Sequence, residues 1–591
     1  MINRRGFLAG AGALCSATPV LAEPKRGFFH GVASGDPQAD RVILWSRISG
    51  FDGTVSASVE VSKTPDFASL VSRSVIATDS SRDFTLKTDM AGLEPGTVYH
   101  YRFTVNEYRS PIGRTRTLPA TSVENVKLAV VSCSNFPAGF FNVYRTIGHH
   151  NDLDAVVHLG DYLYEYPVDG YASERSKEFG RQSVPAHEVT VLADYRARYA
   201  QYRSDPDLRY VHERHPFVCI WDDHEICNDS WTDGAQNHNE GEGSYSLRKA
   251  AALQAFYEWL PIREPEDRPL EAAWREFQFG QIATLAMIET RLMARSKPLD
   301  YSHDLPSTKS WYTKGSRGRY QPIEAQLAAT DANAISLDQI YDRQQQQSIQ
   351  DYAELKRLNS LSALPQGFTR LPDTERFMRE LYPGPERRLL GDRQLNWLQT
   401  TLSQSKSAAT AWQVIGNQTL LSPLKAPDLT RAMSAAEIEA LPPYVRGLIP
   451  LSQYGLPLNL DSWDGYDAER NRFYDSFEGS ANTLVLTGDT HNAWAADILD
   501  ARHNRRLGLE LATPSVSSPG ISETLKMQPA RIEALFKQAN PHFEVLDLGH
   551  RGYVLLDLDR RSARADYRYV NRIDSPQFTV ATGHQVRRNR A

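Results

Sequence analysis

From residue 125 onward, the chain alternates short, wholly apolar runs with longer segments that have helical periodicity. The apolar runs include VKLAVVSCS, DAVVHLGDY and PFVCIWDDHE, and the segments between them include AGFFNVYRTIGHH and VLADYRARYAQYR. A strand that is apolar on both faces has to be covered on both faces, and helical crossovers join parallel strands. The pattern predicts an α/β domain over residues 121–591, with a parallel or mixed sheet between layers of helices.

The preceding segment, residues 23–120, has a different pattern. Short strand-like runs such as RVILWSRI, TVSASVEVS and TVYHYRFTV are separated by turn residues, which is typical of a small β-sandwich. Tyr99 follows a Pro-Gly turn and is similar to the tyrosine corner of fibronectin type III and Ig-like modules. We find no catalytic constellation in this segment, and we interpret it as a docking or shielding module.

Residues from about 296 to 385 interrupt the α/β pattern. They are polar and contain four consecutive glutamines, Gln344 to Gln347. Glutamine-rich tracts of this kind are more often surface than site. We expect a helical or partly mobile insertion here that could cover a cleft of the α/β domain.

The length of the chain indicates how many domains it forms, and its net charge limits its possible partners. A chain of 591 residues exceeds what one hydrophobic core usually holds, so at least two domains are expected. The formal net charge is −6, which leaves no basic surplus of the kind that binds polyanions. We therefore expect no stable complex with nucleic acid, although a small phosphate diester is still a possible substrate.

The first 22 residues have the features of a twin-arginine export signal. Arg4 and Arg5 precede a weakly apolar run, and Ala22 ends a small-residue cleavage site. The signal predicts a partner, the twin-arginine export machinery, and a periplasmic or secreted location. No other segment is long and apolar enough to suggest a transmembrane anchor.

Three cysteines, Cys133, Cys219 and Cys227, lie beyond the predicted cleavage site. Because the number is odd, at least one thiol has to be unpaired. The sequence does not decide whether Cys219 and Cys227 pair, and we favour two structural thiols.

Polar side chains follow the predicted strands at the points where the strands end. In an open α/β sheet, ligands bind beyond the carboxyl ends of the strands, so these side chains are expected to meet. Adjacent acids such as Asp222 and Asp223 also require a compensating cation. The pattern predicts a metal cluster, and the residues at the strand ends are Cys133, Asn135, Asp161, Tyr164, Asp222, Asp223, His224, Glu225, Asn417, Gln418, Asp489 and His491.

A set of motifs, in order along the chain, closely resembles the alkaline phosphatase D (PhoD-like) family. The motifs include GVASGDPQADRVILWSRI, SCSNFPAGFFNVY, HLGDYLYEY, WDDHE, LTGDTHNAW and LATPSVSSPG. More distantly, GDxxY and GDTH resemble motifs of calcineurin-like and purple acid phosphatases. The resemblance implies a four-layer αββα metallophosphoesterase core of two packed mixed sheets flanked by helices.

The same resemblance implies a site built on ferric iron (Fe3+) and calcium (Ca2+), and it assigns roles by position. Asp161 would be the bridging carboxylate, and His224 the catalytic histidine. The other implied metal ligands are Cys133, Tyr164, Asp223, Asn417, Asp489 and His491, where Asn417 stands at a position that related enzymes fill with histidine. We further predict Asp222 as a catalytic residue and Asn135 as a substrate-binding residue.

We therefore expect an exported, metal-dependent phosphoesterase that hydrolyses phosphate mono- and diesters by metal-activated hydroxide, with a role in phosphate scavenging. One alternative is a phospholipase D-like phosphodiesterase that acts on phospholipid head groups. A second is a non-catalytic binding protein on a metallophosphatase scaffold, in which the β-sandwich is the working part. Stoichiometric bound iron would distinguish the two enzymatic functions from the non-catalytic binding protein.

Overall fold

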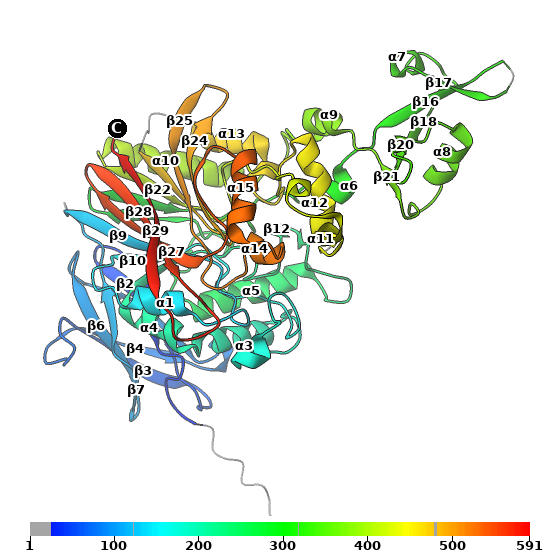
Figure 1. Cartoon of the computed structure of the whole chain (residues 1–591). Coiled ribbons are helices and arrows are strands. Elements are labelled where there is room, and N and C mark those ends of the chain that lie inside the picture. The colour runs from blue at the N-terminus through cyan, green and yellow to red at the C-terminus, as the bar shows by residue number, and fades with distance from the viewer. Residues whose placement is uncertain (1–24, 122, 317, 442, 478–481) are drawn as a thin grey trace, which may run out of the picture.

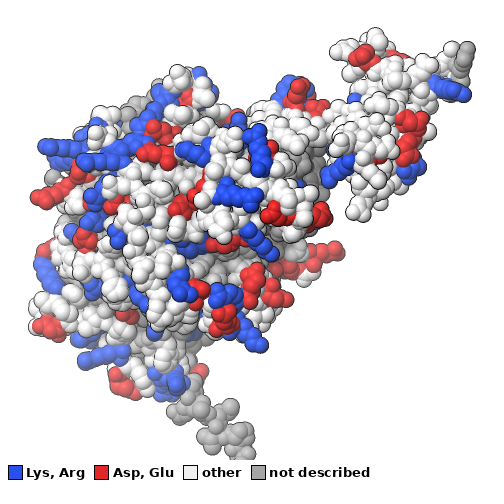
Figure 2. All heavy atoms as spheres, in the orientation of Figure 1, with Lys and Arg blue, Asp and Glu red and all other residues white. Residues whose placement is uncertain are grey.

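A computed structural model describes residues 25–121, 123–316, 318–441, 443–477 and 482–591 (Figure 1). The predicted signal peptide, residues 1–22, lies outside the described residues. None of the helices in the described ranges is long and apolar enough to cross a membrane. On the face shown in Figure 2, acidic and basic side chains are interspersed.

Two mixed sheets form the centre of the molecule. The larger one, as far as the described residues show, has nine strands in the order β29 (Val580–Asn589), β28 (Ser562–Val570), β27 (Arg551–Asp559), β9 (Asn125–Val131), β10 (Ala155–His158), β11 (Pro216–Cys219), β1 (Val32–Gly35), β2 (Arg41–Arg47) and β5 (Thr85–Ala91). In it, β9, β10, β11 and β1 run parallel. The carboxyl ends of β9, β10 and β11 therefore lie at one edge.

The smaller sheet has seven strands within the described ranges, in the order β14 (Arg275–Phe279), β15 (Ala283–Met287), β22 (Trp412–Gly416), β23 (Thr483–Thr487), β25 (Arg505–Ala512), β24 (Ala493–Asp500) and β26 (Phe543–Asp547). The strands from β15 to β25 run parallel. The chain ends in the antiparallel pair β27–β28, and β29 pairs antiparallel with β28.

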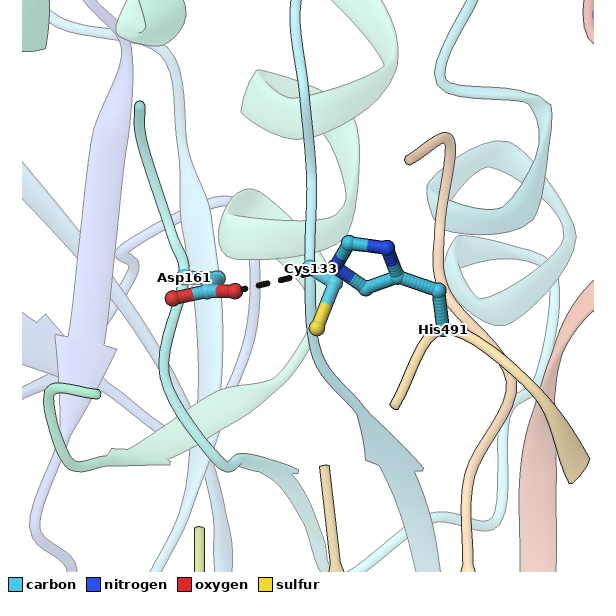
Figure 3. Close-up of side chains that lie close together, drawn as sticks. All are labelled: Cys133, Asp161 and His491. Atoms are coloured by element: carbon cyan, nitrogen blue, oxygen red, sulfur yellow. Dashed lines mark ion pairs between the residues drawn. The ribbon is translucent and has the colours of Figure 1, made fainter. Parts of the chain in front are cut away.

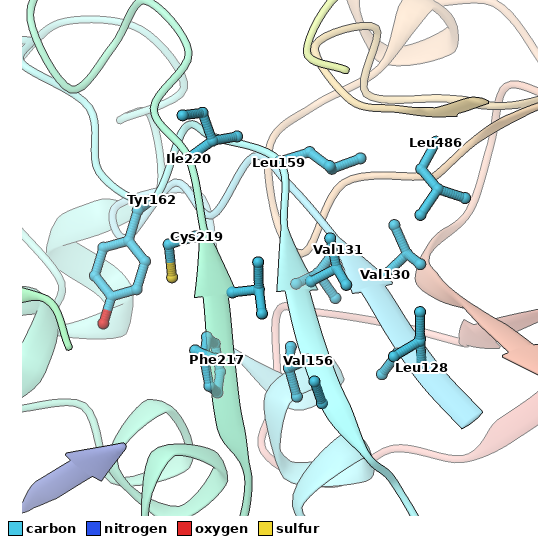
Figure 4. Packing of buried hydrophobic residues seen from close by; sticks show 14 of the residues in the cluster. Leu128, Val130, Val131, Val156, Leu159, Tyr162, Phe217, Cys219, Ile220 and Leu486 are labelled. Atoms are coloured by element: carbon cyan, nitrogen blue, oxygen red, sulfur yellow. The ribbon is translucent and has the colours of Figure 1, made fainter. Parts of the chain in front are cut away.

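The two sheets pack face to face through apolar side chains. Figure 4 shows residues of β9, β10 and β11 beside Leu486 of β23, all within one buried cluster. Gly416 of β22 lies at this interface, where an added Cβ would be 3.4 Å from Leu159 Cδ2, just beyond β10 of the other sheet. The strands are apolar on both faces because each sheet is covered by the other sheet and by helices.

Helices cover the outer face of each sheet. On the larger sheet these are α1 (Asn142–Gly148), α3 (Leu192–Arg203), α4 (Pro206–Arg214) and α5 (Tyr245–Trp259) (Figure 1). On the smaller sheet, α10 (Gly391–Ser407) turns Leu395, Leu398 and Leu402 toward Ile415. The helix α13 (Asp467–Asp475) contributes to the same apolar cluster. The spacing of these leucines puts them on one helical face. The predicted four-layer αββα architecture is therefore confirmed.

The N-terminal segment forms two layers, but one of them is shared. The separate layer consists of β4 (Leu70–Thr78), β3 (Val55–Ser62), β6 (Val98–Val105), β7 (Tyr108–Arg109) and β8 (Gly113–Arg116). The other layer is β1, β2 and β5, which continue the larger catalytic sheet. Tyr99 has the predicted tyrosine-corner contact, because its hydroxyl accepts from Glu94 N at 2.8 Å. Residues 23–120 therefore supply two layers of a sandwich, but only one of these layers is separate from the α/β domain.

The insertion differs from the helical segment that we expected. Two antiparallel sheets form within its described residues, β17 (Tyr320–Ile323)–β16 (Lys309–Lys314)–β18 (Ile335–Asp338) and β20 (Gln347–Ser348)–β19 (Ile340–Asp342)–β21 (Phe368–Arg370). Aromatic and β-branched residues in KSWYTK favour strands, and the polar, glutamine-rich composition concealed that signal. The glutamines are exposed as predicted.

The insertion projects from the rest of the molecule as an arm, with α8 (Tyr352–Asn359) packed on its strands (Figure 1). It has a small apolar cluster of its own, in which Tyr312, Ile340, Leu355 and Leu358 are buried. The arm therefore has the contacts needed to unfold separately from the two central sheets.

This separation gives a first prediction. Leu355→Ala removes about 2–5 kcal/mol of stability from the arm alone, so the arm should be cut by protease while the main thermal transition keeps its midpoint. Leu285→Ala, in the core between the sheets, is the control and should lower that midpoint. Limited proteolysis with mass spectrometry and thermal unfolding measure the two effects. Equal losses of global stability in both variants would contradict a separate arm.

Candidate metal centre

The predicted site residues lie at the carboxyl ends of strands from both sheets. β9, β10 and β11 deliver Cys133, Asp161 and Asp223, and β23 delivers Asp489 and His491. Glycine brings these ends together, because a Cβ on Gly488 would lie 2.9 Å from Ser132 Cβ. Segments separated by about 360 positions of sequence therefore meet at one edge.

Four of these residues have an unusual backbone conformation. The φ angles of Cys133, Asp161, Asp489 and His491 are 62°, 54°, 61° and 60°. Non-glycine residues enter this left-handed region at a cost, and they do so most often where a functional geometry requires it. The strand ends thus turn sharply to present these side chains.

Cys133, Asp161 and His491 form a first group of ligand-type side chains. Their donor atoms lie within 4.8 Å of one another, and the ion-pair distance from His491 Nε2 to Asp161 Oδ2 is 4.0 Å (Figure 3). Tyr164 joins them, since its Oη lies 3.0 Å from Asp161 Oδ2 and 3.1 Å from His491 Nε2. Four predicted ligands therefore converge on one point.

Asp161, Asp223 and His224 form a second group within the same distance limit. Asp161 belongs to both groups, as a bridging ligand would. His224 is held from behind, because Glu165 Oε2 lies 2.8 Å from His224 Nδ1. Glu165 Oε1 in turn accepts from Asn228 N and Asn237 Nδ2, each at 2.8 Å.

Unpaired carboxylate oxygens indicate what this site can bind. Among the described residues, Asp161 Oδ1, Asp222 Oδ2 and Asp223 Oδ1 are buried and have no hydrogen-bond donor. Such groups cost free energy unless a donor or a cation satisfies them. Carboxylate, thiol, phenol and imidazole together are a donor set for metal ions. The residues therefore fit a metal centre in which Asp161 lies between two cation positions.

Burial sets the protonation of the ligand groups. Burial raises the pKa of Asp161, of the Cys133 thiol and of the Tyr164 phenol well above their usual values. Burial also lowers the pKa of His491 to about 4, so this imidazole is neutral and able to ligate at neutral pH. A bound cation would favour the deprotonated acid, thiol and phenol.

His224 shows the opposite behaviour. Burial opposes its charged form, but the carboxylates of Asp223, Glu165 and Asp161 outweigh burial and raise the pKa of His224 well above its usual value. Its ring also packs against that of Tyr164 in a tilted arrangement, with centroids 4.2 Å apart. The imidazolium is therefore a charged proton donor enclosed by acids.

Asp222 does not belong to either ligand group. Its Oδ1 accepts from Arg291 Nε at 2.5 Å, and Arg291 Nη1 also donates to Asp461 at 2.6 Å. Burial raises the pKa of Asp222 to about 6. Asp489 lies 3.8 Å from Arg291 Nη2. The catalytic role of Asp222 stays a prediction, and its observed partner is a buried arginine.

The two predicted asparagines have different surroundings. Asn417 accepts from Trp463 Nε1 at 3.1 Å and donates to Thr419 O at 2.5 Å, so both ends of its amide already have partners. Asn135 is buried, and its Oδ1 has no partner among the described residues. Both roles, metal ligand for Asn417 and substrate contact for Asn135, stay predictions.

All three described cysteines, Cys133, Cys219 and Cys227, are buried free thiols. Cys219 and Cys227 flank WDDHE but do not pair. Our preference for two structural thiols is confirmed.

The comparisons with known proteins agree with this geometry. The sequence model of PhoD-like phosphatases matches residues 128–567, and that of their N-terminal domain matches residues 15–119. The chain belongs to the PhoD-like phosphatase family. This assignment makes it a phosphoric ester hydrolase and confirms the resemblance found in the sequence.

Individual relatives cover almost the whole chain. Alkaline phosphatase D of Bacillus subtilis (strain 168) is 28% identical over 612 residues, which cover 98% of this chain and 86% of that protein. A solved structure of PhoD has 25% identity and a TM-score of 0.70, covering 97% of this chain and 92% of the other. The purple acid phosphatase PPD1 of yellow lupin (Lupinus luteus) seeds shares the fold, with 11% identity, a TM-score of 0.50, and coverage of 94% and 73%.

In this PhoD-like phosphatase, the sequence prediction gave no role to several buried polar residues around the site. Glu225 accepts from Asp161 N at 3.1 Å, Tyr162 N at 2.6 Å and Asp222 N at 2.9 Å, and it thereby ties two strand ends together. Glu225 ends the WDDHE motif and Glu165 directly follows Tyr164, and these places in the sequence could have indicated that both residues support the site. Arg291, Asp461 and Ser518 carry no comparable local pattern.

Gly160 provides the prediction for this site. Its φ is 104°, and a Cβ there would lie 2.3 Å from Asp222 N, so Gly160→Ala should displace Asp161 and Asp222. We expect lower metal content and lower stability. The matched control is Gly180→Ala, with φ 66° and nothing within 4 Å of the added Cβ. It should cost only the backbone strain of about 1–2 kcal/mol.

Elemental analysis and denaturant unfolding of both variants measure the difference. Equal metal content in the two variants would contradict the close packing of the strand ends as a requirement of the site.

Proposed function

We propose that this PhoD-like phosphatase is an exported, metal-dependent phosphoesterase that hydrolyses phosphate mono- and diesters and scavenges phosphate. The observation that carries the proposal is the pair of ligand groups that share Asp161. A shared carboxylate between two cation positions suits the displacement of a leaving group from phosphorus, where both the attacking and the leaving oxygen need charge compensation.

The donor types support Fe3+ in one position and Ca2+ in the other. Cys133, Tyr164 and His491 supply thiolate, phenolate and imidazole, which suit iron better than calcium. Asp223 and Asn417 supply oxygen donors, which calcium prefers. The bound cations would supply Lewis-acid charge and an activated water at neutral to alkaline pH.

His224 is the residue that we assign to proton transfer. Because Glu165 binds Nδ1, the second ring nitrogen is left to face the group of Asp161 and Asp223. A proton held there can pass to the leaving oxygen of the ester as its bond to phosphorus breaks. The three hydrogen bonds to Glu165 keep the ring in this orientation.

Asn135 is the residue that we assign to the substrate phosphate. It is buried beside Cys133, its Nδ2 lies 3.5 Å from Tyr171 O, and its Oδ1 has no partner among the described residues. Its amide nitrogen would donate a hydrogen bond to a phosphate oxygen of the substrate. Small phosphate esters are the expected substrates.

The export proposal rests on the sequence. Arg4, Arg5 and Ala22 have the spacing of a twin-arginine signal, and the residues lie outside those the structure describes. The twin-arginine route carries folded cargo, which suits a protein that acquires iron before it crosses the membrane. We therefore propose a periplasmic or secreted location.

Metal removal tests the proposal directly. Protein purified without added metals should contain iron and calcium, and chelation should abolish the turnover of p-nitrophenyl phosphate and bis-p-nitrophenyl phosphate. Adding both ions back should restore it. Asp161→Asn should lose both metals, whereas Asp475→Asn, at an exposed carboxylate, should retain them. Full turnover in metal-free protein would refute the proposal.

The role of His224 gives a separate prediction. His224→Ala should lower kcat by about 10²- to 10⁴-fold for an alkyl phosphate, whose leaving oxygen needs a proton. The loss should be much smaller for p-nitrophenyl phosphate, because p-nitrophenolate leaves without protonation. Steady-state kinetics on the two esters measure the ratio. Equal losses would assign His224 to phosphate binding instead.

A further inference from the structure

Residues 515–520, which we call the serine segment, contact several predicted site residues. The segment follows β25 and leads into the short helix α14 (Ile521–Thr524). Its sequence, SVSSPG, carries no metal ligand of its own. Its serines at 515, 517 and 518 are fully buried, and buried hydroxyl groups need hydrogen-bond partners. The partners of this segment are found in the candidate metal centre.

The serine segment first fixes the turn that presents Cys133. Ser517 N and Ser518 N both lie 3.3 Å from Cys133 O. Ser517 Oγ donates to Asn135 O at 2.7 Å. These bonds hold the backbone at Cys133, where φ is 62°, and at Asn135 just after it. The strained turn is therefore anchored by this segment from the neighbouring sheet.

The segment also orients His491. Pro519 O accepts from His491 Nδ1 at 2.8 Å. A histidine that donates through Nδ1 leaves the lone pair of Nε2 for a metal, and this arrangement is typical of groups behind metal ligands. The Nε2 atom is the one that lies 3.1 Å from Tyr164 Oη.

Ser518 makes the most direct contact with a predicted ligand atom. Its Oγ lies 2.7 Å from Tyr164 Oη and 3.0 Å from Cys133 O. The other hydrogen-bond partners of Tyr164 Oη are Asp161 and His491. With a cation bound, these two would be ligands and could donate no proton. Among the described residues, Ser518 would then be the hydrogen-bond donor to the phenol oxygen.

We propose that Ser518 is a positioning residue for the metal centre, and that its hydroxyl donates to Tyr164 Oη. This bond fixes the direction of the phenol oxygen and weakens its electron donation to the metal. The serine segment as a whole positions Cys133, Tyr164 and His491 relative to one another. The inference rests on the proposed iron site, since Tyr164 is one of its predicted ligands.

Ser518→Ala tests the inference in the full-length protein loaded with metal. The phenolate-to-iron absorption band should move to longer wavelength, because a phenolate without its hydrogen bond gives up an electron more easily. The half-time of iron loss to a chelator should shorten by about tenfold. For bis-p-nitrophenyl phosphate, kcat should fall while KM stays within about twofold, because Ser518 is fully buried behind Tyr164 and Cys133.

Two comparisons separate this role from a general loss of packing. Ser517→Ala removes an equally buried hydroxyl whose acceptor is the Asn135 carbonyl, so it can lower stability but should leave the band in place. The variants Ser518→Thr and Ser518→Val have side chains of nearly the same volume, but only the threonine retains a hydroxyl. The Thr variant should keep the wild-type band, and the Val variant should show the shift even if Ser518→Ala does not fold.

An unmoved band and unchanged iron retention in Ser518→Ala or Ser518→Val would overturn the inference while leaving the metal mechanism intact. Wild-type protein without stoichiometric iron would overturn the metal mechanism and this inference together.

Discussion

The structure depends on how it compensates several acids that are buried close together. Asp161, Asp222 and Asp223 are almost fully inaccessible, and the nearest basic groups are His224 and Arg291. Like charges at such separations in a poorly solvated site repel strongly. Without a cation, burial raises the pKa of Asp161 and Asp222, whereas Arg291 and His224 outweigh burial at Asp223 and lower its pKa. Bound cations would satisfy the carboxylates and their unpaired oxygens together. The convergence of strand ends, the raised pKa values and the donor types all follow from this single constraint.

Holding these acids together requires a backbone that is strained and well supported. The left-handed conformations of Cys133, Asp161, Asp489 and His491 are unfavourable taken singly. Two of them, Asp161 and Cys133, are supported by hydrogen bonds from distant parts of the chain. Glu225 binds the amide of Asp161, and the serine segment binds the carbonyl of Cys133. The stability of the two packed sheets thus maintains a geometry that no single loop could maintain.

The sequence predicts most of what depends on local patterns. Wholly apolar runs place β9, β10, β11 and β23, and the polar residues that follow them include both observed ligand groups. It does not predict contacts between distant segments of no special composition, such as Arg291 with Asp222 and Asp461, or Ser518 with Tyr164. Nor does it predict the strands of the insertion, because aromatic alternation in a polar, glutamine-rich segment is a weak signal. Tertiary contacts decide these features.

The shared sheet gives the N-terminal module a role beyond docking or shielding. β1 hydrogen-bonds to β11, the strand that leads into WDDHE. Directly after β1, the buried carboxylate of Asp36 pairs with Arg275 at 2.7 Å, and Arg275 also donates to Cys219 O at 2.6 Å, at the carboxyl end of β11. The N-terminal residues therefore hold the strand end from which Asp222, Asp223 and His224 project. Because a buried ion pair is costly to break on one side, these contacts couple the N-terminal module to the candidate metal centre.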